Sequence, residues 1–79
     1  MASFPTLELD ELLAFTRVVQ AQSFSQAGRD LGLPKSSVSR KLTELEARVG
    51  ARLLQRTTRS VSLTDLGRTF YDHAVRIVT

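Results

Sequence analysis

Hydroxyl and cationic side chains gather between positions 35 and 41 of this 79-residue chain. Such groups donate hydrogen bonds and carry positive charge, so they suit phosphate oxygens and the polar edges of nucleic-acid bases. Its serines are a poor basis for hydrolysis, because no second catalytic base and no oxyanion-binding feature accompany them. The members of this cluster are Lys35, Ser36, Ser37, Ser39, Arg40 and Lys41.

Few residue types are left for catalysis or metal binding. The chain has no Cys and a single histidine, His73, which excludes a disulfide framework, a thiolate zinc site and an imidazole cluster. We therefore expect no enzymatic activity, no metal and no cofactor, and we expect His73 to be exposed or at a dimer interface. No apolar run approaches the roughly 18 residues of a membrane span, and no secretory signal is visible, so a cytoplasmic protein without membrane contact is expected.

The positive charge is concentrated in the middle third of the chain. The formal net charge is +3 and the isoelectric point is near 10.2. Residues 1–33 carry two basic and four acidic side chains, residues 34–59 carry seven basic and two acidic ones, and the remainder is balanced. This distribution favours a polyanionic partner that contacts the middle segment. Two of these cations, Arg48 and Arg52, are expected to be solvated or paired within the chain.

Apolar spacing predicts three helices before residue 50. The first runs from near Glu8 to about Ala21, and a second, capped by the Ser25 hydroxyl, continues to Leu31. Gly32 then allows a very short turn, because glycine readily adopts the conformation that ends a helix. A third helix begins at Pro34 and ends at Gly50. Its apolar stripe consists of Val38, Leu42, Leu45 and Val49.

The pattern changes after residue 53. Polar and apolar side chains alternate at 60–63, which predicts a short β-hairpin. Thr64 can cap a final helix with a broad apolar face, and this helix reaches Thr79 without a stop signal, so we expect the chain to continue in a longer protein. That apolar face consists of Leu66, Phe70, Tyr71, Ala74, Val75, Ile77 and Val78.

Two helices joined by a tight glycine turn, the second with a basic N-terminal end, are typical of a helix-turn-helix, and the hairpin adds a wing. The predicted fold is mainly α: a winged helix-turn-helix with a three-helix core and a short β-hairpin wing, followed by a final helix with a broad apolar face.

The chain resembles the DNA-binding domain of LysR-type transcriptional regulators, in which a winged helix-turn-helix and a linker helix precede an effector-binding domain. The resemblance covers nearly the whole chain. It rests on Phe15, Val19, Ser23-Phe24-Ser25-Gln26-Ala27, Leu31-Gly32-Leu33, Val38-Ser39-Arg40, Leu42, Leu45-Glu46, Val49-Gly50 and the segment from Leu53 to Gly67.

The resemblance implies sequence-specific binding of double-stranded DNA by a bacterial regulator. It also implies that residues 1–63 form the winged helix-turn-helix DNA-binding domain and that residues 64–79 form a long linker or dimerisation helix. Base readout in the major groove would fall to Lys35, Ser36, Ser39 and Arg40, and phosphate contacts to Ser25, Ser37, Arg56 and Thr58. Arg59 at the wing would enter the minor groove. A homodimer would form through the last helix, with contacts from Leu66, Phe70, Tyr71, Ala74 and Ile77.

Two-fold symmetry of that dimer implies an operator that is an interrupted inverted repeat. RNA polymerase is a further expected partner of the full-length protein. A competing interpretation makes the domain a winged-helix module for protein interaction and dimerisation, in which the basic segment only keeps the chain soluble.

Overall fold

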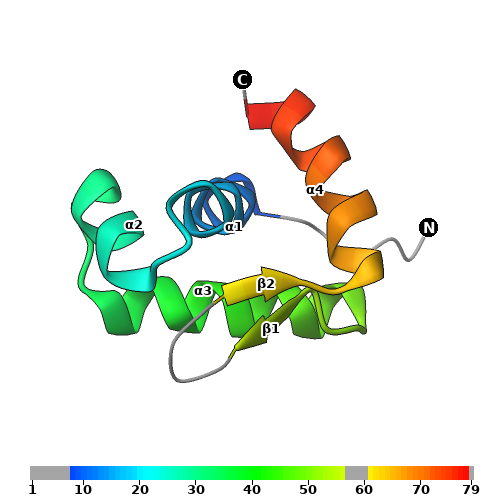
Figure 1. Cartoon of the computed structure of the whole chain (residues 1–79). Coiled ribbons are helices and arrows are strands. Elements are labelled where there is room, and N and C mark those ends of the chain that lie inside the picture. Colours follow the sequence, from blue (N-terminus) through cyan, green and yellow to red (C-terminus); the bar gives the residue numbers. More distant parts are fainter. Residues whose placement is uncertain (1–7, 57–60, 79) are drawn as a thin grey trace, which may run out of the picture.

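The computed structural model describes residues 8–56 and 61–78. Its elements follow in the order α1 (Leu9–Ala21), α2 (Phe24–Leu31), α3 (Lys35–Val49), β1 (Leu54–Arg56), β2 (Val61–Leu63) and α4 (Asp65–Val78), shown in Figure 1. Helices therefore dominate the described residues, and the two strands form one antiparallel hairpin. The predicted mainly helical winged helix-turn-helix with a following helix is confirmed.

Helix α1 lies at the centre of the fold. Figure 1 shows it end-on, with α3 below it and with α2 and α4 on opposite sides. Phe15 on α1 is fully buried. Its ring forms T-shaped pairs with the rings of Phe70 and Tyr71, at centroid distances of 5.6 and 6.1 Å. Such T-shaped pairs add to the stabilisation that burial alone provides. Because α1 contacts every other helix, it fixes the position of α3 relative to the rest of the domain.

The start of α2 differs from the prediction. The N-cap is Ser23, whose Oγ accepts a hydrogen bond from the backbone N–H of Gln26 at 3.0 Å. Ser25, the predicted cap, lies inside the first turn and is exposed. The predicted cap was wrong because α2 begins two residues earlier than expected, with Phe24 as its first residue.

Ser23→Ala is expected to lower the free energy of unfolding by about 1 kcal/mol, because the amide of Gln26 loses its acceptor at the helix end. The matched control is Ser25→Ala, which removes an exposed hydroxyl two residues away and should stay within about 0.5 kcal/mol of the parent chain. Urea unfolding followed by circular dichroism measures both. Equal losses for the two variants would contradict the assignment of Ser23 as the cap.

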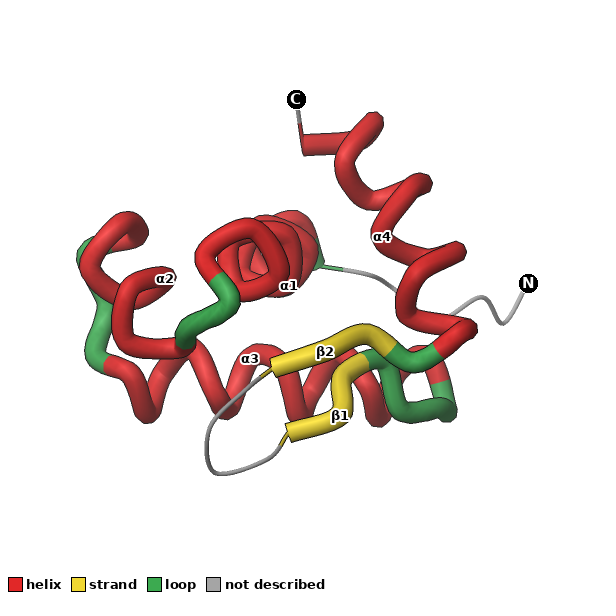
Figure 2. The backbone as a smooth tube through the Cα atoms, viewed as in Figure 1, coloured by secondary structure: helices red, strands yellow, loops and turns green. Residues whose placement is uncertain are grey.

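The turn between α2 and α3 is short, as Figure 2 shows. Gly32 ends α2 with φ +71°, and the Leu33 N–H donates to the Gly28 carbonyl at 2.8 Å. Pro34 is the N-cap of α3, so this helix begins at Lys35, one residue later than predicted. The Pro34 carbonyl accepts from the N–H groups of Ser37 and Val38, which directs the next residues into the helix.

The hairpin is fastened to α3 by Glu46. One carboxylate oxygen of Glu46 accepts from the backbone N–H groups of Leu53 and Leu54 at 2.8 and 3.0 Å. Leu54 pairs with Leu63 across the two strands, and Arg56 pairs with Val61. The predicted hairpin is therefore present, and the loop between its strands lies outside the described residues.

Helix α4 begins with the predicted cap. The Thr64 Oγ1 accepts from the Gly67 N–H at 2.9 Å and donates to the Arg52 carbonyl at 2.7 Å. The Thr64 N–H also donates to the Leu53 carbonyl at 3.1 Å. These bonds fix the first turn of α4 against the segment that precedes the hairpin.

Candidate nucleic-acid interface

The first two turns of α3 present the predicted base-reading side chains. Lys35, Ser36 and Arg40 are exposed, and Ser39 is half-buried. Their exposure follows from the apolar stripe of α3, because fully buried Val38 and its partners turn the opposite face of the helix outward. Residues three and four apart share a helix face, so Ser36, Ser39 and Arg40 form one polar surface.

Arg56 connects three elements at the edge of this surface. It ends β1, and its guanidinium carbon lies 4.6 Å from the centroid of the Phe24 ring on α2. Its Nη1 donates to the Ser39 Oγ on α3 at 3.2 Å. The structure therefore brings a predicted phosphate contact, Arg56, together with a predicted base reader, Ser39.

The other predicted phosphate contacts are divided. Ser25 is exposed in the first turn of α2, and Ser37 is half-buried in the first turn of α3. Thr58 and Arg59, the predicted phosphate and minor-groove contacts of the wing, lie outside the described residues.

Two cations of the basic segment are used inside the chain. Lys41 Nζ donates to Asp10 at 2.6 Å, and Arg48 Nε donates to the Glu11 carboxylate at 3.0 and 3.3 Å. The hydrogen bond from Lys41 holds the pKa of Asp10 below its ordinary value and, conversely, raises the pKa of Lys41. The expectation that Arg48 is solvated or paired is confirmed by its contact with Glu11.

Neither of the ion pairs within residues 8–56 and 61–78 involves Lys35, Arg40 or Arg56. These three cations lie on α3 and at the end of β1. Lys41 and Arg48 are therefore less available to a polyanion than the sequence count implies.

The predicted dimer face of α4 is only partly free. Leu66 and Ile77 are 47% and 60% exposed, whereas Phe70 and Tyr71 are half-buried against Phe15. Ala74 is 1% exposed and belongs to the core of its own chain. Within one chain the core therefore already covers Ala74, and its contact with a second copy stays a prediction.

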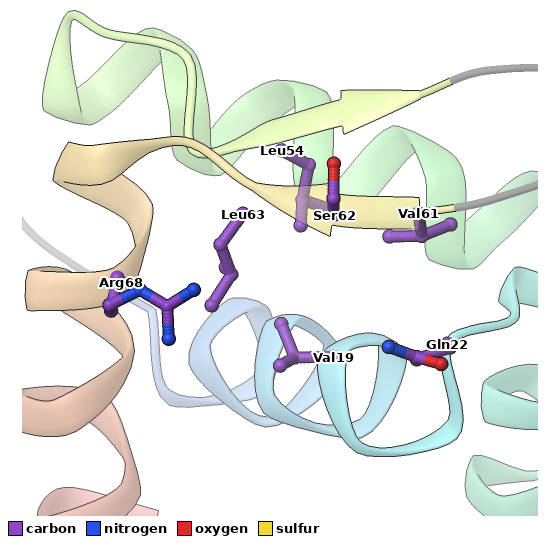
Figure 3. A pocket seen from close by; sticks show the side chains of 7 residues that line it. All are labelled: Val19, Gln22, Leu54, Val61, Ser62, Leu63 and Arg68. Atoms are coloured by element: carbon purple, nitrogen blue, oxygen red, sulfur yellow. The ribbon is translucent and has the colours of Figure 1, made fainter.

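A pocket of about 230 Å³ lies between α1, the hairpin and α4. Figure 3 shows the side chains that line it, and none of them belongs to the predicted DNA-contacting set. No group of three metal-ligating side chains occurs among the described residues, and no helix there is long and apolar enough to cross a bilayer. The lining residues are Val19, Gln22, Leu54, Val61, Ser62, Leu63 and Arg68.

Residues 9–68 match the family model described as bacterial regulatory helix-turn-helix protein, lysR family. The chain belongs to the LysR family. Over 72 residues it is 51% identical to an HTH-type transcriptional regulator of Xanthomonas campestris pv. campestris, covering 91% of this chain and 21% of the relative. It is 43% identical over 70 residues to a probable HTH-type transcriptional regulator, LtrA, of Klebsiella pneumoniae, covering 89% of this chain and 23% of that protein.

Solved LysR-family structures are similar to this chain in fold. The BenM DNA-binding domain in complex with catB site 1 DNA superimposes with a TM-score of 0.86 at 37% identity, covering 90% of this chain and 80% of that one. The CbnR DNA-binding domain in a DNA complex gives 0.86 at 32% identity, covering 90% and 82%. The chain spans about a fifth of the length of the curated LysR-family relatives described above. The predicted family is thus confirmed, and this chain carries its winged helix-turn-helix DNA-binding domain.

Proposed function

We propose that this LysR-family domain binds double-stranded DNA sequence-specifically, with the N-terminal turns of α3 in the major groove. The observation that carries the proposal is the exposed surface of Lys35, Ser36 and Arg40 at the start of the second helix of a helix-turn-helix. An α-helix fits the major groove, where each base pair presents a distinct set of donors and acceptors. The similar BenM and CbnR domains are solved in DNA complexes, which supports DNA binding by this fold.

Each exposed side chain has a role in this proposal that follows from its chemistry. Arg40 donates two hydrogen bonds to guanine, and Lys35 reaches guanine or a phosphate. Ser36 and Ser39 contact base edges. Phosphates are bound by Ser25, Ser37, Arg56 and Thr58, and Arg59 enters the minor groove.

A homodimer is the second part of the proposal. Leu66 and Ile77 remain exposed on α4, and half-buried Phe70 and Tyr71 lie on the same helix. Pairing of two such helices would present two copies of α3 to one duplex. Half-sites about 34 Å apart, one helical turn of DNA, then form an interrupted inverted repeat. In the whole regulator, promoter binding in the cytoplasm would act on transcription through RNA polymerase.

Selection from a random pool of double-stranded DNA at near-physiological salt tests the proposal. An interrupted inverted repeat is expected to be enriched by the parent chain. Arg40→Ala is expected to lose about 5- to 150-fold in affinity for the enriched duplex, because a bidentate arginine–guanine contact discriminates by about 1–3 kcal/mol. Arg17→Ala on the exposed side of α1 removes the same charge and is the control.

The two variants separate specific from general electrostatic binding. Equal losses for Arg40→Ala and Arg17→Ala would show that charge alone carries the affinity. Failure of the parent chain to retain any duplex would overturn the proposal and favour the winged-helix protein-interaction module instead.

A further inference from the structure

We propose that Arg56 fixes the hydrogen-bonding direction of Ser39, so that the Ser39 hydroxyl donates to an acceptor atom of a base and does not accept from a base amino group. The acceptor atoms in the major groove are purine N7, guanine O6 and thymine O4. The inference rests on the proposed function, because it names the kind of atom that Ser39 reads within the same interface.

The contact between the two side chains has only one possible direction. A guanidinium has five N–H donors and no acceptor, so Arg56 donates and the Ser39 Oγ accepts, at 3.2 Å. A serine hydroxyl has one proton and two lone pairs. The contact occupies one lone pair of Ser39 and leaves its proton for another partner.

Arg56 is held in this position from a second side. Its guanidinium carbon lies 4.6 Å from the centroid of Phe24, within the roughly 6 Å range of a cation–π interaction. Phe24 is half-buried at the start of α2 and packs against the core. The backbone of Arg56 is paired with Val61 in the hairpin. Contacts from α2, α3 and the hairpin thus hold the guanidinium in place in the absence of DNA.

A guanidinium beside the hydroxyl also changes what the hydroxyl binds well. Its positive charge draws electron density from the Ser39 oxygen, which makes the O–H a better donor, because hydrogen bonds in series polarise one another. The same charge repels a second N–H donor that approaches the oxygen. Amino groups of adenine and cytosine are therefore poor partners, although a serine without such a neighbour serves as donor or acceptor equally. Arg56 is in this sense a positioning residue for base readout.

Duplexes with single-atom changes test the direction of this hydrogen bond. The parent chain, Ser39→Ala, Arg56→Met and the double variant are each used to select from the random duplex pool, and the position whose preference depends on Ser39 is identified. Duplexes are then made with a modified base at that position. 7-Deazaguanine lacks N7, 2-aminopurine lacks the O6 of guanine, and 5-methyl-2-pyrimidinone lacks the O4 of thymine. Purine and 2-pyrimidinone, which lack the amino groups of adenine and cytosine, are the comparison.

One acceptor-deleted duplex is expected to bind the parent chain about three- to tenfold more weakly, the effect of one hydrogen bond, and amino-deleted duplexes are expected to bind unchanged. Arg56→Met should reduce the preference at this position as Ser39→Ala does, and the double variant should show no further loss of preference there. Arg52→Met, which removes an exposed cation nearby in the chain, is the charge control and should leave that preference intact.

Three results would overturn the inference while leaving the proposed function standing. The first is an Arg56→Met variant that weakens all duplexes equally and keeps the preference at the Ser39-dependent position. The second is a Ser39→Ala variant with unchanged preference at every position. The third is sensitivity to amino deletion in place of acceptor deletion. Melting curves verify that each variant is folded. Arg56→Lys, which keeps the charge, is measured beside them. Absence of any enrichment by the parent chain would instead overturn the proposed function, and this inference with it.

Discussion

Gly67→Ala is expected to destabilise the domain by at least about 3 kcal/mol, at the upper end of what overpacking costs. A Cβ at Gly67 would lie 2.0 Å from the Leu53 carbonyl oxygen and 2.9 Å from its carbon. The Leu53 backbone has little freedom to move away, because its N–H donates to Glu46 and its carbonyl accepts from Thr64. The first turn of α4 must therefore shift, which breaks the bonds that fasten this helix to the domain.

Gly50→Ala is the matched control for that variant. A Cβ at Gly50 meets nothing within 4 Å, but the residue has φ +81°. The left-handed conformation costs an alanine about 1–2 kcal/mol. Thermal unfolding separates the two mechanisms, because 1 kcal/mol shifts Tm by about 4–8 °C in a domain of this size. A smaller fall in Tm for Gly67→Ala than for Gly50→Ala would refute the close approach between α4 and Leu53.

Local spacing in the sequence was sufficient to predict most of the elements. The stripe of Val38, Leu42 and Leu45 recurs at helical spacing and is fully buried along α3. The alternation at 60–63 predicted a strand where β2 occupies Val61–Leu63, and Gly32 predicted the turn before α3. These features depend on residues close together in the chain, so a single sequence contains them.

Contacts between distant residues were not predictable in this way. Arg56 and Ser39 are 17 positions apart, and Glu46 reaches Leu53 through the fold, although Glu46 was noted only as part of the family pattern. The apolar face of α4 shows the same limit. Helical spacing placed Ala74 on the apolar face of α4 but gave no sign that the core of its own chain buries it.

The candidate interface was predictable for a local reason as well. Lys35, Ser36 and Arg40 oppose the buried stripe of α3, and helical periodicity alone turns them outward. The charge count was less informative. The exceptions expected among the cations of residues 34–59 were Arg48 and Arg52, whereas Arg48 and Lys41 are the two that pair with acids of α1.

Those two ion pairs join the same helices, yet they are expected to contribute differently to the free energy of unfolding. Arg48→Met should lower the free energy of unfolding by about 2–3 kcal/mol, below the 3–5 kcal/mol of a fully buried pair. The Glu11 side chain is 3% exposed and would lose the hydrogen bonds from Nε, while the Arg48 side chain is 39% exposed and water reaches it. Chemical denaturation of the variant measures the difference.

Lys41→Met is the matched control, because it also removes one cation of α3 that contacts α1. Asp10 is 60% exposed on its side chain, and such pairs contribute about 0–1 kcal/mol. The lowered pKa of Asp10 means that this contribution is present above its ordinary value of 3.8 and is lost as the pH falls below it. Equal losses for Lys41→Met and Arg48→Met at neutral pH would contradict the distinction between the two pairs.

Arg48→Met also separates stability from DNA readout. Arg48 lies eight residues beyond Arg40 on α3, about 12 Å along a helix that rises 1.5 Å per residue. Its guanidinium contacts Glu11 on α1, whereas Arg40 is exposed in the second turn of α3. Arg48→Met should therefore reduce the folded fraction on heating yet leave the base preference of the folded domain unchanged. Selection from the duplex pool well below the variant's Tm measures this, and an altered preference would mean that the contact between α1 and α3 sets the angle at which α3 meets DNA.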